Sequence, residues 1–183
     1  YHDFEAPNIT SDQNSTITAN LFNFDTKGAD ISSSGGELKL IAKETQDNDL
    51  VIKYGQINLN NGGLSYYKDS GSATLANLKL CNGVESITIT SQGDSFIEAK
   101  DLSLGGNTIT SSGGFLTLKG VKDGSTFGNI TVGDHGGLSV VKKTADVYEG
   151  TTIKVQNGSS LTLQANAPFT SSSYLLGGGK FGV

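Results

Sequence analysis

Apolar and polar residues alternate with a period of two along most of the chain. Clear examples are residues 87–90 (ITIT), 116–118 (LTL) and 161–163 (LTL). Successive side chains of a strand point to opposite faces, so this pattern predicts strands with one apolar face and one hydroxyl-rich face. Glycine recurs every few residues and an apolar period of 3.6 is missing, which argues against helices. The pattern therefore predicts an all-β protein.

The predicted strands share one local pattern, in which a strand, a polar turn with two small residues and a second strand follow one another. It recurs as ISSSGGELKL (31–40), INLNNGGLSYY (57–67), ITSSGGFLTL (109–118), ITVGDHGGLSVV (130–141) and IKVQNGSSLTL (153–163). The gap between the pairs at 62 and 113 has room for two units, with residues 83–90 as a degenerate one. A period of about 22 residues predicts a β-solenoid in which each unit is one coil.

Stacking is required because one short coil cannot bury its own apolar face. We expect two interior columns, one before each turn and one after it. The first is Ile31, Ile57, Ile109, Ile130 and Ile153, and the second is Leu38, Leu64, Leu116, Leu138 and Leu161. The alternative is an antiparallel β-sandwich, in which the Gly-Gly pairs close ordinary hairpins. The recurring register favours the solenoid.

The repeat divides the chain into three parts. Residues 14–166 form the solenoid region, and residues 1–13 are expected to be an N-terminal arm or cap. Residues 167–183 lose the pattern and are expected to be an irregular C-terminal segment or a continuation. An open solenoid end exposes unpaired strand edges, so each end needs a cap or a neighbour.

Composition narrows the function. The net charge is −5 and every basic residue is Lys, so the basic face that nucleic-acid binding needs is not expected. No stretch approaches the ~20 apolar residues of a membrane-spanning helix, so we expect no membrane insertion. Charged residues make up only 17%, which together with regular alternation argues against disorder.

Candidate catalytic and metal-binding residues are few. Asp134 and His135 are expected in an exposed turn, and Cys81 follows Leu78 and Leu80 and is expected to be a small core or turn residue. Asp47 and Asp49 flank an asparagine, but the glycine and distal glutamate of an EF-hand loop are missing, so we expect a solvated loop. The sequence therefore predicts no catalytic residue, no metal and no cofactor, and hence no enzyme.

Two groups of residues are candidates for contact with a ligand. They are Tyr66, Tyr67 and Lys68 in one strand, and Lys142 and Lys143 in another. Neighbouring strand residues point in opposite directions, so one of the two tyrosines should face outward. A tyrosine beside a lysine is a plausible contact for a sugar or a protein, and ordinary surface polarity at a strand end is the alternative. Sequons for N-glycosylation begin at Asn8, Asn14, Asn129 and Asn157.

Residues 31–40, 109–118 and 150–163 (GTTIKVQNGSSLTL) resemble coils in the passenger domains of secreted bacterial adhesins. These are the autotransporters and the two-partner-secreted exoproteins of the filamentous-haemagglutinin type, and the resemblance covers roughly residues 14–163. It implies a right-handed parallel β-helix, located outside the bacterial cell or on its surface, that serves adhesion and virulence. Such passengers are generally poor in cysteine, and Cys81 is a mild departure.

The sequence and the resemblance together predict a non-catalytic extracellular structural or adhesive module. It would bind a host receptor, a glycan or a neighbouring copy through its repeated polar faces. One alternative is a self-assembling filament subunit, joined through residues 1–13 and 167–183. The other is a polysaccharide-cleaving β-helix enzyme or phage tailspike fragment, which needs two carboxylates facing one cleft.

Overall fold

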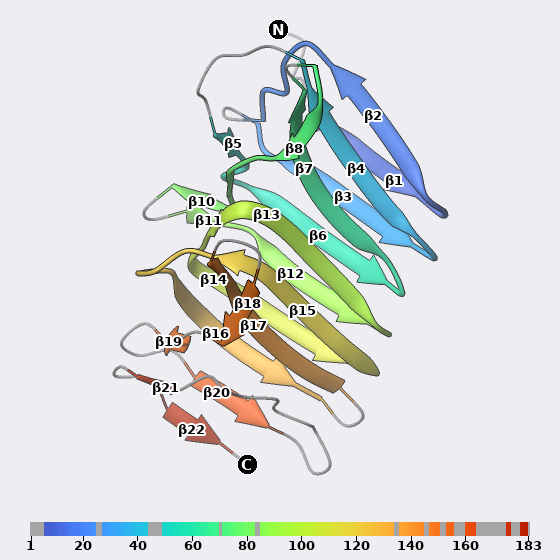
Figure 1. The fold of residues 1–183 in the computed structure, drawn as a ribbon. Helices are drawn as coiled ribbons and strands as arrows, with labels where there is room; N and C mark the ends of the chain where they lie inside the picture. The colour runs from blue at the N-terminus through green and yellow to red at the C-terminus, as the bar shows by residue number, and fades with distance from the viewer. Residues whose placement is uncertain are drawn as a thin grey trace, which may run out of the picture.

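The computed structural model describes residues 6–24, 27–43, 49–69, 71–82, 85–133, 136–144, 147–150, 153–155, 160–163, 175–176 and 180–182. These residues contain strands and no helix, and they form a parallel β-helix of about five turns with coils of about 23 residues (Figure 1). The predicted β-solenoid is confirmed. The antiparallel sandwich is wrong, because neighbouring rungs of both large sheets run parallel.

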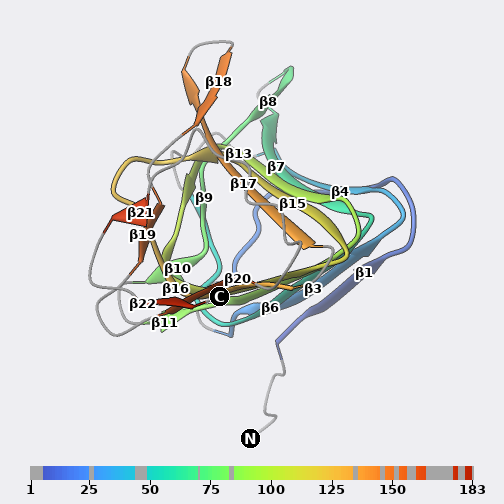
Figure 2. The ribbon, with the colours of Figure 1, turned by 90° about the horizontal axis from the view of Figure 1, so that it is seen from below.

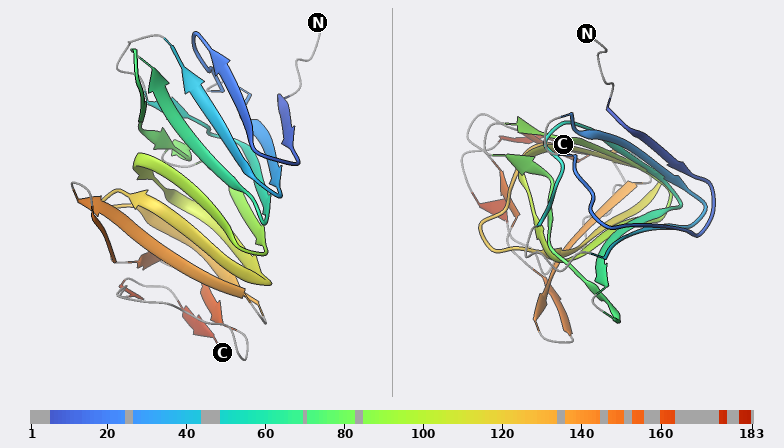
Figure 3. Two further views of the ribbon diagram at one scale, coloured as in Figure 1. Left: turned by 45° about the vertical axis from the view of Figure 1, so that its right-hand side comes forward. Right: turned by 90° about the horizontal axis from the view of Figure 1, so that it is seen from above.

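Sheet A forms one side of the rod and contains ten strands. Its first six rungs are β1 (Asn8–Ser11), β3 (Ala29–Ser34), β6 (Gly55–Asn60), β12 (Thr88–Gln92), β14 (Gly105–Ser112) and β16 (Thr126–Val132). It continues with β19 (Ile153–Val155), β20 (Ser160–Leu163), β21 (Leu175–Leu176) and β22 (Lys180–Gly182). Figure 3 shows the strands of the two large sheets stacked along the rod axis.

Sheet B forms the second side. Its rungs are β2 (Ser15–Ala19), β4 (Glu37–Ala42), β7 (Gly63–Asp69), β13 (Ser95–Ser103), β15 (Gly114–Val121) and β17 (Gly136–Thr144). The short strand β9 (Leu78–Lys79) pairs with the end of β13, and β5 (Leu50–Val51) pairs with β9, so that together they form a third side. Figure 2, a view along the axis, shows the resulting triangular coil.

Within the described ranges, three antiparallel hairpins interrupt the parallel stacking. They are formed by β7 with β8 (Ala73–Leu75), by β10 (Cys81–Asn82) with β11 (Glu85–Ser86), and by β17 with β18 (Val147–Gly150). The hairpins of β8 and β18 project from the same side of the rod (Figure 2). Each adds residues at a corner of the triangle and leaves the rungs stacked.

These insertions explain why coil length varies. Register partners are 26 residues apart at Asp30 and Gln56, 32 at Asn58 and Thr90, and 20 at Thr90 and Thr110. The longest interval contains two of the hairpins. The gap between the glycine pairs at 62 and 113 does hold two coils, as predicted, and β12 and β13 belong to the additional one.

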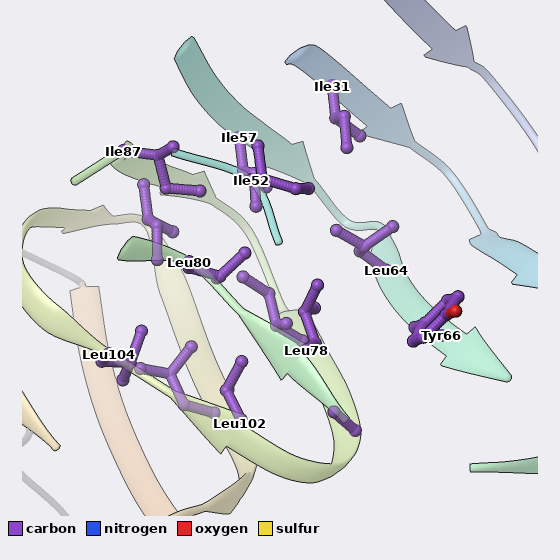
Figure 4. Packing of buried hydrophobic residues seen from close by; sticks show 14 of the residues in the cluster. Ile31, Ile52, Ile57, Leu64, Tyr66, Leu78, Leu80, Ile87, Leu102 and Leu104 are labelled. Atoms are coloured by element: carbon purple, nitrogen blue, oxygen red, sulfur yellow. The ribbon is translucent and has the colours of Figure 1, made fainter. Parts of the chain in front are cut away.

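The core is built from ladders of apolar side chains. On sheet A, Ile9, Ile31, Ile57, Ile89, Ile109 and Ile130 pair in register, and all but Ile9 are fully buried. On the third side, Leu50, Leu78 and Leu102 form an equivalent ladder. Figure 4 shows leucines and isoleucines of different rungs directed into the coil. Each such side chain contributes roughly 1.5–3 kcal/mol to folding by leaving water.

The predicted second column is partly wrong. Leu38 and Leu64 continue into Ile97 and Leu118, whereas Leu116 and Leu138 stack with Ser95. The column shifts by two residues because the segment between the isoleucine and the column residue lengthens from seven residues (Ile57 to Leu64) to eight (Ile89 to Ile97) and nine (Ile109 to Leu118). A two-residue shift keeps the same face inward. All four of the predicted leucines up to Leu138 are still buried.

In the last predicted repeat, residues 153–163, the prediction that Leu161 continues the second column is wrong. Leu161 pairs with Ile130, so it lies in the first column of sheet A, and Ile153 pairs with Leu175. Both β19 and β20 stack on the single strand β16. Alternating hydrophobicity is the same for every side of the triangle, so it cannot tell one side from the other.

The turns between sheets A and B are held by hydrogen bonds from buried serine hydroxyls to backbone carbonyls. The hydroxyl of Ser33 donates to the carbonyl of Gly36 at 2.9 Å, and that of Ser111 donates to the carbonyl of Gly137 at 2.7 Å. Gly35 has a φ of +69°, and a Cβ on Gly36 would lie 2.4 Å from the backbone nitrogen of Asn14 in the rung above. The Gly-Gly pair is required because adjacent turns stack backbone against backbone.

The first rung lies within the segment for which an arm or cap is expected. β1 pairs with β3, and β2 pairs with β4, so residues 8–11 already belong to the stack. Ile17 is 37% exposed and Leu21 is 51% exposed at this end. Of the segment 167–183, only β21 and β22 are described, and both continue the parallel pairing.

Candidate binding face

The outward side of sheet A, from β1 to β16, is called face A here. Its central column consists of the residues that directly follow the isoleucine ladder: Thr10, Ser32, Asn58, Thr90, Thr110 and Thr131. Because side chains alternate along a strand, a buried isoleucine turns its neighbour outward. The isoleucine ladder therefore aligns a ladder of hydroxyl and amide groups on the surface.

A second outward column lies two residues further along each strand. It contains Ser34, Asn60, Gln92 and Ser112, and Asn60 and Gln92 are exposed register partners. Between the two columns runs a groove of about 410 Å³ that crosses β3, β6, β12 and β14. Face A is therefore hollowed along the rod axis, with polar groups of four successive rungs lining the hollow.

Face A carries almost no charge. Among the outward residues of its six strands, Asp30 alone is ionisable, and it does not line the groove. One carboxylate oxygen of Asp30 accepts a hydrogen bond from the backbone nitrogen of Gln56 at 3.1 Å. The groove is consequently lined by uncharged residues, most of which carry a hydroxyl or amide group.

Some of these groups bond to neighbouring side chains, one across the rungs and one between consecutive residues. The hydroxyl of Thr90 donates to the side-chain oxygen of Asn58, and the amide of Asn61 donates to that of Asn60 at 3.2 Å. An asparagine has two donor hydrogens and an acceptor oxygen with two lone pairs, and a hydroxyl both donates and accepts. The bonded groups keep donors and acceptors for a ligand, and the internal bonds hold them in fixed orientations.

The outward side of sheet B, face B, is different. Glu37 pairs with Lys39 at 3.3 Å, and Glu98 pairs with Lys119 at 3.8 Å. The Lys119 ammonium lies 4.6 Å from the centre of the Phe96 ring. These four charged groups are thus paired with their own neighbours.

The outward aromatic rings of face B cover glycines. A Cβ on Gly63 would lie 2.3 Å from the Phe96 ring, and a Cβ on Gly137 would lie 2.7 Å from the Phe115 ring. A hollow of about 300 Å³ lies beside them, lined by Asp94, Ser95, Phe96, Phe115, Thr117 and Lys119. The rings fill space that the glycines leave open in neighbouring strands.

The two predicted tyrosines point to opposite faces of β7, as the alternation along a strand requires. Tyr66 is only 2% exposed and lies in the core, with its ring edge-on to Phe22. Burial raises the pKa of its hydroxyl, and the negative charge of Asp49 adds to this. Tyr67 points outward, with the Lys39 ammonium 5.8 Å from its ring centre. Tyr66 is therefore wrong as a contact residue, and Tyr67 remains a prediction.

The predicted lysines lie at the two projecting hairpins. Lys68 on β7 is opposite Thr74, and Lys142 on β17 is opposite Glu149. Lys143 follows on the same strand, and its side chain lies outside the described residues. β13 and β15 lie between β7 and β17, so the fold does not bring the two groups together.

The acidic segment around residue 49 forms an ion pair. Asp49 lies 2.6 Å from the ammonium of Lys79 and accepts a hydrogen bond from Asn77 at 2.8 Å. Burial acts to raise the pKa of Asp49, but the bonds from Lys79 and Asn77 and the charges of Lys79 and Lys68 hold it below its ordinary value. Asp47 lies outside the described residues.

Among the other candidates for chemistry, the structure describes Cys81. Cys81 is half-buried, and its sulfur would lie 2.8 Å from a Cβ on Gly105. Asp134 and His135 are not among the described residues. In the described part of the chain no three His, Cys, Asp or Glu side chains are grouped as metal ligands. That part also contains no helix long and apolar enough to cross a membrane.

Three of the four sequons are on the surface. Asn8, Asn14 and Asn129 are exposed, and Asn157 lies outside the described residues. The side-chain oxygen of Asn14 accepts a hydrogen bond from the backbone nitrogen of Glu37 at 2.8 Å. Asn14 is therefore already used in the stacking of the turns.

The groove residues Asn58, Asn60, Thr90 and Gln92 were missed by the sequence analysis. Their signal is present, since Asn58 and Thr90 each follow an isoleucine of the ladder. Their proximity depends on the pairing of β6 with β12, which the intervening hairpins conceal. Comparison of the chain with protein-family models, with curated proteins and with solved structures found no match.

Proposed function

We propose that this protein is a non-catalytic extracellular adhesive module of a bacterial surface or secreted protein, and that face A is its binding surface. The observation that carries the proposal is the uncharged groove across four rungs of sheet A. The resemblance of the coils to secreted adhesin passengers supports the extracellular location.

The rod favours distributed binding. Its outward groups are fixed by a buried ladder, so a ligand that spans several rungs meets a preorganised row of donors and acceptors. A single neutral hydrogen bond adds only about 0.5–1.5 kcal/mol, so useful affinity requires several of them in a row. Face A offers such a row.

The absence of catalysis is part of the proposal. Three of the described carboxylates, those of Glu37, Asp49 and Glu98, are each paired with a lysine. General acid–base cleavage of a glycoside needs two carboxylates converging on one cleft, and the groove of face A is lined by none.

The test is an attachment assay on the intact chain. Beads coated with wild-type protein are compared on cultured epithelial cells with beads carrying Asn58→Ala, Thr90→Ala and Gln92→Ala together. The matched control carries Thr16→Ala, Thr18→Ala and Thr117→Ala, which remove outward polar groups from face B. We expect the face A variant to lose most attachment and the control to keep it. Equal attachment of both variants contradicts the proposal.

One observation favours a second candidate function, the filament subunit. In the described part of the chain β1 and β2 each pair on one edge only, and Ile17 and Leu21 are exposed beside them. An open edge with apolar residues is a template for further strands. Sedimentation of the wild type against Ile17→Lys tests it, since a filament should shorten when a charge is placed at the edge.

A further inference from the structure

We infer that the ligand of face A is a neutral, extended glycan chain that lies in the groove along the rod axis. This inference rests on the proposed function of face A, and it names the chemical class of the ligand. Three features of the groove lead to it: its lack of charge, its mixture of donors and acceptors, and its use of strands from the middle of a sheet.

The lack of charge excludes strongly ionic ligands. An anion in the groove would lose its water without gaining a cationic partner, because no lysine lines the hollow. The net charge of −5 also repels anions at a distance. A cationic ligand would find no carboxylate in the groove itself.

The side chains match sugar hydroxyls. A sugar hydroxyl both donates and accepts, and it bonds well to groups that do the same. The centre of the groove combines the amides of Asn58, Asn60 and Gln92 with the hydroxyl of Thr90, contributed by the paired strands β6 and β12. These four residues are the expected primary contacts.

The strands of the groove cannot accept an extended peptide by strand addition. β6 pairs with β3 and β12, and β12 pairs with β6 and β14, so their backbone groups are used on both sides. Strand addition requires a free sheet edge. Recognition on face A must therefore use side chains, which favours a ligand rich in hydroxyl groups over a peptide backbone.

The spacing of the rungs favours a repeating polymer. Equivalent groups recur at each rung, about 4.8 Å apart, so four rungs extend over roughly 14 Å. A linear polymer with a short repeat can place similar hydroxyls against successive rungs. Affinity should rise with chain length until the ligand fills the groove and then stay level.

The experiment is a glycan array probed with the intact chain, followed by calorimetry. The array holds neutral linear glucans, mannans and galactans of increasing length beside sulfated and uronic-acid glycans. We expect binding to neutral linear chains, rising with length, and no preference for the anionic ones. In calorimetry on the best neutral binder, Asn60→Ala with Gln92→Ala should weaken binding about tenfold or more. The face B control with Thr16→Ala, Thr18→Ala and Thr117→Ala should bind like the wild type.

The outcomes separate the two proposals. If only anionic glycans bind, or if neutral glycans bind equally well to the Asn60→Ala, Gln92→Ala variant, the inferred ligand is wrong. If no neutral glycan binds while the face A variant still loses attachment to cells, the ligand is again wrong but the proposed binding face stands. If attachment does not depend on face A, the proposed function itself fails. Unchanged thermal unfolding of the variants checks that only the surface was altered.

Discussion

Sheets A and B share one interior and differ in their outer surfaces. Inside, both present aliphatic ladders, with Ile57 and Ile89 on sheet A and Leu64 and Ile97 on sheet B. Outside, face A has hydroxyl and amide groups around a neutral groove, whereas face B has lysines, carboxylates and aromatic rings. Stacking constrains the interior on both sides equally, so it cannot be the cause of this difference.

The difference lies in how the outward groups are satisfied. On face B each ion pair and each ring has a partner in the same sheet, as with Lys119, Glu98 and Phe96. On face A, Asn60 and Gln92 project into solvent beside a hollow. The ion pairs and rings of face B are therefore satisfied within their own sheet. The neutral face A is the better candidate for binding a partner.

The largest expected effect tests the shared interior. Ile89→Ala in sheet A and Leu118→Ala in sheet B should each lower the free energy of unfolding by about 2–5 kcal/mol, because each leaves a cavity in a fully buried ladder. Urea denaturation measures this, and Thr90→Ala and Thr117→Ala, on the outward positions beside them, serve as controls. If the truncation lowers the free energy of unfolding on one sheet only, the two sheets do not contribute equally to the shared interior.

A smaller effect tests the aromatic cover of face B. Gly63→Ala places a methyl group against the Phe96 ring and should cost about 1–3 kcal/mol through overpacking. Adding Phe96→Ala should recover part of this loss, since the added methyl then meets a small neighbour. A double-mutant cycle by thermal unfolding measures the coupling. Strictly additive losses would mean that the ring does not cover the glycine.

The turns that join the two faces should give an effect of about 1 kcal/mol. Asp94 accepts a hydrogen bond from the backbone nitrogen of Phe115 at 2.9 Å, as Asn14 does from Glu37 at 2.8 Å three coil intervals earlier in the stack. Asp94→Ala and Asn14→Ala each leave a backbone donor without this acceptor. Asp94→Asn, which keeps an acceptor oxygen, is the matched control. Chemical denaturation should rank the alanine variants below it.

The smallest effect concerns the ion pair on the third side. The pKa of Asp49 is lowered in the folded state, so its contribution to stability is present above the ordinary pKa of aspartate, about 3.9. It is lost as the pH falls through the folded pKa. Because Lys79 is largely exposed, we expect less than about 1 kcal/mol. The difference in unfolding free energy between wild type and Asp49→Asn should therefore shrink between pH 6 and pH 3. A constant difference would contradict it.

The sequence was sufficient for the fold and for one interior column. Alternation fixes which side chains face inward, and the Gly-Gly turns mark where the chain bends, so Ile31, Ile57, Ile109 and Ile130 were correctly aligned. It failed at Leu161, because period-two alternation is identical on all sides of the coil. The end of the chain therefore could not be assigned to a sheet from its pattern.

The candidate site was less accessible to sequence reasoning. Because neighbouring side chains of a strand point to opposite faces, only one of Tyr66 and Tyr67 can face outward. The alternation does not say which of the two it is. The groove depends on Asn60 lying beside Gln92, a pairing across 32 residues with two hairpins between. No local pattern encodes that distance, since each hairpin adds length without altering the stack.

The direction of the hydrogen bonds between rungs has a mechanical consequence. They run along the rod, so tension on its two ends acts on one pair of rungs at a time and not on all of them together. A coil of about 23 residues that is released in this way extends to about 80 Å, against about 5 Å when stacked. If the rod serves as the proposed adhesive module, a sudden pull would release its coils one after another, and the rod would lengthen before the bound ligand dissociated.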